Sequence, residues 1–313
     1  MKSTGESPDA KRAKIHEKPS ADALLSVKKS KKRTISIAVC ASMLENLKGE
    51  GSKHRVIAQI ARAAAIFRVN EVIVVDDAYK NPGFDSSKDS NLFQLILEYL
   101  DCPQYLRKSL FPMCLELKHI GVAPPLDASH HVRMEDEVPY REGIVTRVSL
   151  GSVWLDVGLH EDIKIESRAE VKQGLRVTVN MTEKSIVGPD TPRKKDGLYW
   201  GYRTRVAKSI SEVIALCPFE KGYDMTIGTS ERGESILELE ALGKFRHLLI
   251  VFGGPKGLEH ALEQDKALTQ VKEPKNVFDK YLNTCPLQGS RTIRTEEAVL
   301  ISLSALQKYF WCS

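Results

Sequence analysis

The stretch Gly289-Ser290-Arg291-Thr292-Ile293-Arg294-Thr295-Glu296-Glu297-Ala298 combines a glycine turn, a basic strip and the start of an apolar helix. Thr295 is a good N-cap residue, and the two acids after it suit the positive end of a helix. Two further glycine segments lie upstream, at 228–233 and 253–257. Because each follows an apolar strand pattern, we expect three loops that form one ligand slot built mostly from backbone.

The pattern around these loops predicts an α/β fold. Residues 34–40 are rich in β-branched side chains, and residues 71–77 are nearly all apolar, as in a central parallel strand. Between them, residues 54–69 carry apolar side chains at helical spacing. This β-α-β order is typical of a parallel sheet. We expect further strands at 201–206, 224–228, 247–252 and 277–283, and further helices at 92–100, 208–217, 234–242, 258–264 and 295–310.

Residues 124–187 have a different character. Short strands separated by turn residues are predicted at 141–148, 152–157, 162–166 and 175–181. Their spacing suggests a small β-barrel of the oligonucleotide-binding type, and a β-rich insertion with only structural duties is the alternative. The predicted organisation is a basic tail at 1–33, an α/β domain formed by 34–123 and 188–313, and an inserted barrel at 124–187.

The positive charge of the chain lies in the tail. Residues 1–33 hold ten Lys or Arg and four Asp or Glu, a net charge of +6, whereas the whole chain carries +5, which leaves −1 for the remainder. Any RNA contact in the folded part must therefore come from local patches. We expect the tail to be disordered. Its cluster Lys28-Lys29-Ser30-Lys31-Lys32-Arg33 reads as a nuclear-localisation or polyanion-binding segment, or simply as a solvated basic tail.

Several function classes are disfavoured. No apolar run is long enough to cross a bilayer, and the start of the chain has no secretory signal. Six cysteines without a CxxC pair argue against a zinc site or a disulfide framework, so we expect no metal. The segment 253–257 lacks the P-loop pattern of nucleotide-binding enzymes, and 228–233 lacks the spacing of the hydrolase nucleophile elbow.

The glycine segments resemble the SPOUT class of RNA methyltransferases. The resemblance is closest to the eukaryotic SPOUT-domain-containing methyltransferases, whose animal form is also named as a centromere protein, and it covers nearly everything after residue 34. It rests on Gln59-Ile60-Ala61-Arg62-Ala63, Cys102-Pro103-Gln104-Tyr105-Leu106-Arg107-Lys108, Gly197-Leu198-Tyr199-Trp200-Gly201-Tyr202, Thr226-Ile227-Gly228-Thr229-Ser230-Glu231-Arg232-Gly233, Asn283-Thr284-Cys285-Pro286 and the opening stretch. That stretch also resembles a motif of bacterial uridine-N3 methyltransferases acting on ribosomal RNA.

The resemblance implies a C-terminal trefoil knot, S-adenosylmethionine as methyl donor with S-adenosylhomocysteine as product, an RNA substrate and a homodimer. It also implies a cofactor held by main-chain groups. By position, the cofactor-binding residues are then Thr229, Gly253, Gly254, Asn283, Thr284, Pro286, Gly289, Ser290, Ile293 and Thr295.

Arg232 is the candidate catalytic residue. When a ring nitrogen of a base loses its proton, a guanidinium near the carbonyl oxygens stabilises the charge that develops. A salt bridge to Glu231 or Glu234 is the alternative role for this side chain. The sequence offers no convincing general base.

RNA contacts are expected from basic residues at the barrel exit and near the last glycine loop. The candidates for phosphate contact are Arg193, Lys194, Lys195, Arg203, Arg205, Arg291 and Arg294. Tyr199, Trp200 and Tyr202 either stack on bases or belong to the core. The resemblance thus implies an RNA methyltransferase that modifies a base of ribosomal RNA, with uridine N3 favoured, and we expect it in the nucleus or nucleolus. The alternative is a non-catalytic RNA-binding or scaffold protein of ribosome biogenesis or the mitotic spindle.

Overall fold

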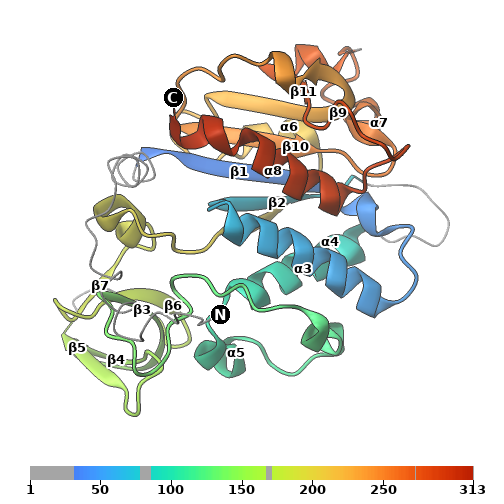
Figure 1. Ribbon diagram of the computed structural model, residues 1–313. Coiled ribbons are helices and arrows are strands. Elements are labelled where there is room, and N and C mark those ends of the chain that lie inside the picture. The colour runs from blue at the N-terminus through green and yellow to red at the C-terminus, as the bar shows by residue number, and fades with distance from the viewer. Residues whose placement is uncertain (1–31, 78–85, 167–170, 272, 313) are drawn as a thin grey trace, which may run out of the picture.

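The computed structural model describes residues 32–77, 86–166, 171–271 and 273–312. The predicted basic tail lies almost wholly outside the described residues, as does most of the Lys28–Arg33 cluster, so tail disorder and nuclear targeting stay predictions. The described chain forms a six-stranded sheet and a separate five-stranded sheet, which lie apart in Figure 1.

The six-stranded sheet is parallel throughout, with the order β11-β9-β10-β1-β2-β8. Its central strands are buried along their whole length, which explains why their sequences are almost continuously apolar. The strands are β1 (Thr34–Cys40), β2 (Glu71–Val75), β8 (Arg203–Ala207), β9 (Met225–Ser235), β10 (His247–Phe252) and β11 (Lys280–Asn283).

Helices cover both faces of this sheet. On one face, α3 (Glu50–Ile66), α4 (Ser86–Asp101) and α8 (Thr295–Cys312) pack over a core of fully buried aliphatic and aromatic side chains (Figure 1). On the other face lie α6 (Ile210–Ala215) and α7 (Gly257–Gln264), with a smaller core of their own. The shorter elements are α5 (Gln104–Leu110), a π-helical turn at Pro192–Asp196 and the 3₁₀ turns Ala41–Leu44, Leu115–Leu117, Ile120–Val122, Ile236–Glu238 and Pro274–Asn276. The expected α/β class with a parallel sheet is confirmed.

The five-stranded sheet is antiparallel, with the order β5-β4-β3-β6-β7. The four strands predicted for this region are present within one or two residues of their expected bounds, and β7 is an additional short strand. One face encloses a small core that includes Leu155 and Val179, while Ile144 on β3 packs against Leu106 of α5. The strands are β3 (Tyr140–Ser149), β4 (Ser152–Asp156), β5 (Ile163–Glu166), β6 (Arg176–Asn180) and β7 (Ser185–Val187).

Two expectations for residues 228–242 are wrong. The segment 228–233 is not a loop, because β9 continues through it to Ser235, and only a 3₁₀ turn stands where a helix was predicted. A Cβ atom on Gly233 would lie 2.5 Å from the carbonyl carbon of Leu282 in β11. Gly233 therefore allows two strand backbones to approach closely across a bulge, which is a strand role rather than a loop role.

A buried polar cluster joins the two sheets. Arg176 of β6 lies 2.9 Å from Glu142 of β3 and 3.1 Å from Asp101 of α4. Trp200 donates its indole N–H to Glu142, and the Tyr202 hydroxyl donates to the carbonyl of Leu97. Tyr199 and Tyr202 are buried, so the core interpretation of these aromatic residues is the correct one.

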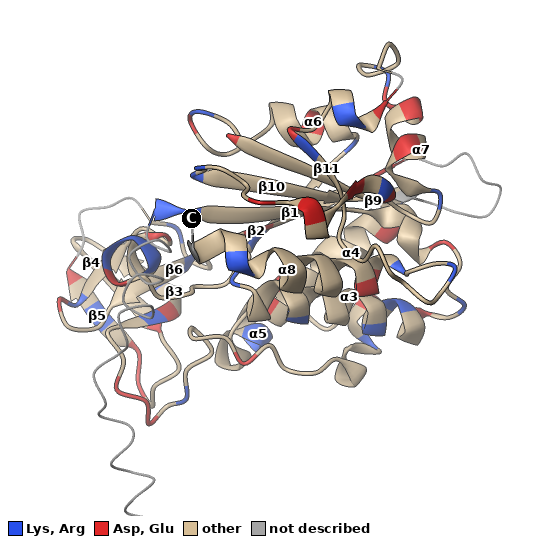
Figure 2. Cartoon of the chain, turned by 45° about the horizontal axis from the view of Figure 1, so that its top comes forward, with Lys and Arg blue, Asp and Glu red and all other residues tan. Residues whose placement is uncertain are grey.

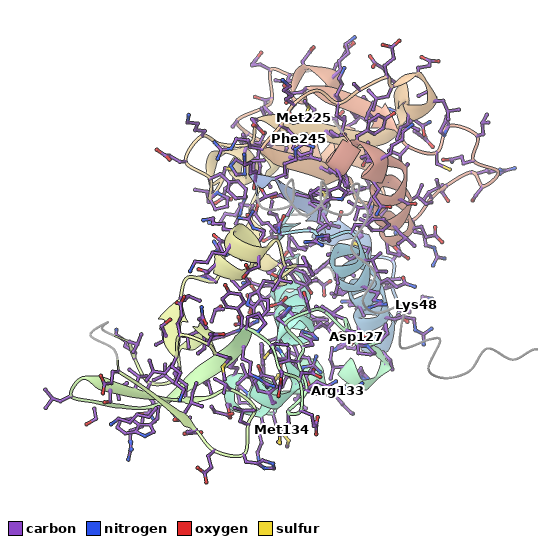
Figure 3. The ribbon with its side chains drawn as sticks, turned by 60° about the vertical axis from the view of Figure 1, so that its left-hand side comes forward. Lys48, Asp127, Arg133, Met134, Met225 and Phe245 are labelled. Carbon is purple, nitrogen blue, oxygen red and sulfur yellow. The ribbon has the colours of Figure 1, made fainter. Side chains whose placement is uncertain are left out.

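The segment before β3 is fastened to the same region. The Arg141 guanidinium donates to the carbonyl oxygens of Arg133 and Met134. In Figure 3, Arg133 and Met134 lie beside the five-stranded sheet, whereas Met225 and Phe245 lie in the six-stranded part.

In a parallel sheet all strands begin at one edge and end at the opposite edge. The five-stranded sheet and the glycine loop can be located relative to these two edges. Arg203 and Asn70, at or just before the beginnings of β8 and β2, line a cavity together with Arg176 of the five-stranded sheet. The ends of β9, β10 and β11 lie at the opposite edge, where the glycine loop 253–257 begins. The five-stranded sheet and the glycine loop therefore occupy opposite edges of the main sheet.

Candidate active site

A cavity of about 590 Å³ opens at the carboxyl edge of the six-stranded sheet. This volume falls in the range of small-molecule sites, and such sites in α/β proteins form at this edge. Its walls come from the ends of β9, β10 and β11, the turn after β1 and the first turns of α7 and α8.

Seven of the ten predicted cofactor residues line this cavity: Thr229, Gly253, Gly254, Asn283, Thr284, Ile293 and Thr295. Pro286, Gly289 and Ser290 are not among the lining residues. Ser290 is exposed, and its polar groups serve a local turn: its hydroxyl donates to the Thr292 carbonyl at 2.8 Å, and its own carbonyl accepts from Gln288. The structure therefore does not bring these three residues to the cavity.

The glycine loop passes so close to the end of β1 that no side chain fits. A Cβ atom on Gly254 would lie 2.0 Å from the Ser42 hydroxyl oxygen. Ser42 cannot easily move aside, because both its backbone N–H and its hydroxyl donate to Asp77. Burial raises the pKa of Asp77, although the hydrogen bonds from Ser42 oppose that shift. Glycine at 254 is thus a packing requirement.

The beginning of α8 corrects one expectation. The backbone N–H of Arg294 donates to the Glu297 carboxylate at 2.9 Å. The Arg294 carbonyl accepts from the backbone N–H of Ala298, as the first carbonyl of a helix does. This is the Glu half of a capping box, and it makes Arg294, not Thr295, the N-cap residue. The Thr295 hydroxyl donates instead to the carbonyl of Gly253 at 3.0 Å.

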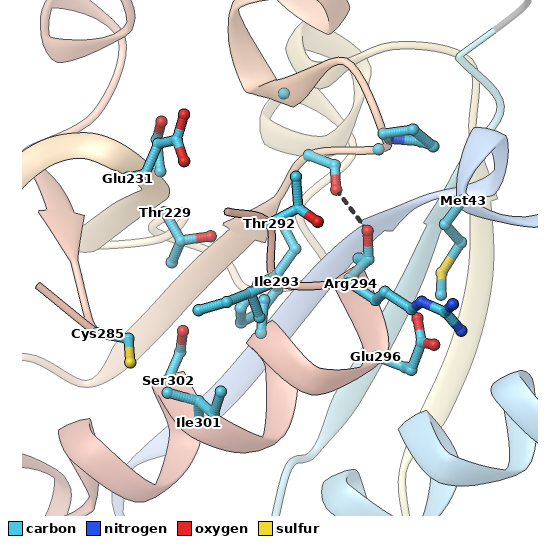
Figure 4. A pocket seen from close by; sticks show the side chains of 18 of the residues that line it. Met43, Thr229, Glu231, Cys285, Thr292, Ile293, Arg294, Glu296, Ile301 and Ser302 are labelled. Atoms are coloured by element: carbon cyan, nitrogen blue, oxygen red, sulfur yellow. Dashed lines mark hydrogen bonds between the residues drawn. The ribbon is translucent and has the colours of Figure 1, made fainter. Parts of the chain in front are cut away.

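Hydroxyl and amide groups connect β11 to its neighbours. The hydroxyls of Thr284 and Ser302 are 2.7 Å apart, and the side-chain amide of Asn283 donates to the Glu231 carbonyl at 2.9 Å. Figure 4 shows Thr229, Ile293 and Ser302 pointing toward one another from three different segments. Ser302 is buried on α8 and was not predicted, although a lone serine within an apolar helix face is a usable signal.

Arg232 lies on the rim of the cavity and is 73% exposed. Its guanidinium lies 3.5 Å from the carboxylate of Glu259 in the first turn of α7, so its partner is neither of the acids proposed from the sequence. The hydroxyl of Tyr281 on β11 donates to the same carboxylate oxygen at 3.0 Å. Sequence reasoning missed Glu259, because nothing local links α7 to β9.

Comparison with known proteins identifies the family. A family model described as "Putative RNA methyltransferase" matches residues 34–306. The chain belongs to this family. The expected membership in an RNA methyltransferase family is thereby confirmed.

Three curated relatives match most of the length of this chain. The fly protein named 28S rRNA (uridine-N(3))-methyltransferase is 46% identical over 303 residues, which cover 88% of this chain and 62% of the Drosophila melanogaster protein. The human protein of the same name is 46% identical over 297 residues, covering 88% of this chain and 78% of its own. The Caenorhabditis elegans putative methyltransferase spot-1 is 34% identical over 310 residues, with 88% and 80% covered.

A solved structure is also similar. The SpoU methyltransferase AviRb from Streptomyces viridochromogenes, in complex with AdoMet, matches with a TM-score of 0.35 and 10% identity, covering 88% of this chain and 58% of its own.

The expected RNA contacts of this methyltransferase-family chain separate into two groups. Arg294 lines the candidate active site, and Arg291 is exposed nearby in sequence. At the opposite edge, Lys194 and Arg203 lie 3.4 Å and 3.3 Å from Asp190. Arg193 and Arg203 line the second cavity, of about 420 Å³, and Lys195 is exposed on the same turn.

Arg205 has a different environment from the other basic candidates. Its guanidinium lies 2.8 Å from the buried carboxylate of Glu71, donates to the Val213 carbonyl at 2.9 Å and contacts the Tyr223 hydroxyl. Its interpretation as a phosphate contact is therefore corrected: it neutralises a buried acid inside the sheet.

The described residues contain no group of three or more His, Cys, Asp or Glu side chains placed to hold a metal ion. None of their helices combines the length and apolar character needed to span a membrane.

Proposed function

We propose that this chain is an S-adenosylmethionine-dependent methyltransferase that modifies N3 of a uridine in ribosomal RNA. The observation that carries the proposal is the convergence of Thr229, Gly253, Asn283 and Thr295 on one cavity, with Arg232 on its rim. The name of the fly and human relatives supports the choice of reaction.

The residues present fit the proposed cofactor. The cavity has a suitable volume, and its lining includes Gly253 and Gly254, which have no side chains to cover their main-chain groups. Thr229, Gly253, Gly254, Asn283, Thr284, Ile293 and Thr295 would hold it. When bound, the cofactor supplies an electrophilic methyl group.

In this reaction the protein has to stabilise the negative charge that develops on the base. A uridine N3 must lose its proton before it can accept a methyl group, and the resulting negative charge spreads onto the two neighbouring carbonyl oxygens. Arg232 is a cation on the cavity rim that is exposed enough to meet them. N3 belongs to the Watson–Crick edge, so the base has to be unpaired or flipped out to react.

The knot and the barrel belong to the same proposal. We infer that the segment after β9 forms the trefoil knot, supported by the strand order β11-β9-β10 and by the return of Thr295 to Gly253, 42 residues earlier. We also infer that the five-stranded sheet is an oligonucleotide-binding-type insertion. Its place beside the cluster of Arg193, Lys194 and Arg203 supports a second RNA contact.

A homodimer is a further part of the proposal. The ribbon of α8 is mostly tan in Figure 2, with acidic residues in its first turn, and Leu300 on this helix is exposed. Leu237 and Leu287, also exposed, lie in the segments that follow β9 and β11. Light scattering that finds only monomers at working concentrations would count against the dimer.

The test of the function uses two measurements on the full chain. Calorimetry with S-adenosylhomocysteine should give a Kd of roughly 1 μM, or about −8 kcal/mol. Methyl transfer to ribosomal RNA, read by mapping of modified uridines, should fall to a small residual rate in Arg232→Ala with that binding retained. RNA binding without any heat from S-adenosylhomocysteine would instead indicate the non-catalytic scaffold. Unchanged transfer by Arg232→Ala would remove this arginine from the site.

A further inference from the structure

The carboxylate of Glu259 connects one helix, α7, to two strands, β9 and β11, at the mouth of the cavity. Its Oε1 atom accepts from the Tyr281 hydroxyl on β11 at 3.0 Å and from the Ser230 hydroxyl on β9 at 3.5 Å. The same atom lies 3.5 Å from Nη1 of Arg232, also on β9. Glu259 is 25% exposed and Arg232 is 73% exposed, so the acid is the better anchored of the two.

Local geometry explains why Glu259 points this way. It lies in the first turn of α7, two residues after Gly257, which has a φ of +83°. A Cβ atom on Gly257 would lie 2.6 Å from Oε2 of Glu259, so the carboxylate folds back over the start of its own helix. Burial raises the pKa of Tyr281 to about 12, and the nearby Glu259 charge adds to the shift. Tyr281 therefore stays protonated and donates to the carboxylate.

The contact is poorly explained as a contribution to stability. An exposed ion pair contributes little to folding, and an acid in the first turn of a helix needs no partner to interact with the helix dipole. What the contact does is restrict an arginine side chain that otherwise has many rotamers. A site that acts by charge stabilisation works best when its cation is already oriented.

We propose that Glu259 is a positioning residue that orients the Arg232 guanidinium at the mouth of the cavity before RNA arrives. This proposal rests on the proposed function, in which Arg232 stabilises charge on the base. Tyr281 and Ser230 hold Glu259, and Glu259 in turn holds Arg232. Loss of the carboxylate leaves Arg232 present but disordered, which should lower kcat on the order of ten- to hundred-fold. The KM for RNA and the affinity for S-adenosylhomocysteine should change little.

The decisive experiment is a double-mutant cycle. Glu259→Gln, Arg232→Ala and the double variant are compared for kcat, KM and S-adenosylhomocysteine affinity. If Glu259 acts through Arg232, Glu259→Gln slows the wild-type enzyme but has no further effect in the Arg232→Ala background. An equal loss in both backgrounds would overturn the proposal, because Glu259 would then act by another route. The matched control is Glu263→Gln on the same helix, whose carboxylate lies 3.8 Å from His260 instead, and it should leave kcat unchanged.

A second readout needs neither cofactor nor RNA. In the free protein, the NMR signal of the Arg232 Nε–H group should show restricted motion in the wild type and in Glu263→Gln. Glu259→Gln should release it, and Glu259→Asp should restore part of the order. A signal equally mobile in the wild type and Glu259→Gln would overturn the proposal. If Arg232→Ala itself transfers methyl groups normally, the catalytic role of Arg232 fails; if only Glu259→Gln is normal, the positioning role fails alone.

Discussion

The hydroxyl of Thr295 donates a hydrogen bond of 3.0 Å to the carbonyl oxygen of Gly253. The bond joins the first residue of α8 to the loop after β10, and both residues line the candidate cofactor cavity. It fixes the distance between two walls of the cavity, which local structure in either segment would leave free. The helix cap does not depend on it, because Arg294 and Glu297 form the cap.

Replacing Thr295 by Val tests that connection. The shape of the side chain is kept while the donor is lost, and one such hydrogen bond contributes about 1 kcal/mol. We expect the affinity for S-adenosylhomocysteine to fall about five-fold at 25 °C, measured by calorimetry. Thr295→Ser keeps the donor and is the control. Equal affinities for the Val and Ser variants would show that the bond does not shape the cavity.

Gly254→Ala should abolish cofactor binding. The new methyl group would lie 2.0 Å from the Ser42 hydroxyl oxygen, and the next atoms are at 3.4 and 3.5 Å, which are ordinary contacts. Removing the hydroxyl in the double variant Ser42→Ala/Gly254→Ala should therefore restore part of the S-adenosylhomocysteine binding seen by calorimetry. Gly51→Ala, at a site with open space in α3, is the neutral control. Failure of the double variant to recover would mean that the loop needs glycine for another reason.

Arg205 and Arg203 should behave in opposite ways. Arg205→Ala leaves the carboxylate of Glu71 buried and unpaired, which should lower the free energy of unfolding by about 3–5 kcal/mol in urea denaturation. Arg203 is 59% exposed, so Arg203→Ala should leave stability nearly unchanged. If Arg203 contacts a phosphate, its loss should reduce the slope of log Kd against log salt for RNA by about 1. An intact salt slope in Arg203→Ala would remove it from the RNA surface.

The buried cluster at the junction of the sheets predicts a stability that depends on pH. Burial alone would raise the pKa of Asp101, but His130 and Arg176 outweigh it and lower the pKa from 3.8 to about 2. Burial alone would lower the pKa of His130, but Asp101 raises it above 6.5. Burial and the charge on His130 lower the pKa of His131 to about 4.

The signs follow from proton binding in the two states. The ionised Asp101 contributes stability that is lost as pH falls from about 4 to about 2. His131 resists protonation when folded, so stability also falls between pH 6.5 and about 4. The charged His130 contributes stability that is complete below pH 6.5 and is lost as pH rises through its folded pKa. Urea denaturation should show the alkaline loss in the wild type but not in His130→Asn; parallel curves above pH 6.5 would contradict this assignment.

Patterns of short range predicted the elements of the fold. Thr34–Cys40 and Glu71–Val75 are mostly apolar because both faces of a central parallel strand are covered. The same logic located β10 and α8 within a few residues. Glycine is ambiguous by comparison, because it suits a loop and a close strand crossing equally. That ambiguity explains why the sequence predicts a loop at 228–233, although Gly233 lies within β9 and packs against Leu282 of β11.

The site was predicted in part for a related reason. The motif residues Gly253, Gly254, Asn283 and Thr284 converge because they follow parallel strands, whose ends share one edge. No such rule places Ser290, whose turn uses its own polar groups, nor Arg205, whose partner Glu71 lies 134 residues away. Arg205 and Glu71 form an ion pair only because β8 and β2 are neighbours in the sheet.

By itself, the sequence determined most of the strands and helices, because these follow from local periodicity. Only the tertiary structure decided the contacts between segments. It brought Glu259 to Arg232, Thr295 to Gly253 and the five-stranded sheet to the edge opposite the cavity. The physical reason is that an ion pair or hydrogen bond depends on a separation of a few ångströms in space, and strand order sets that separation independently of distance along the chain.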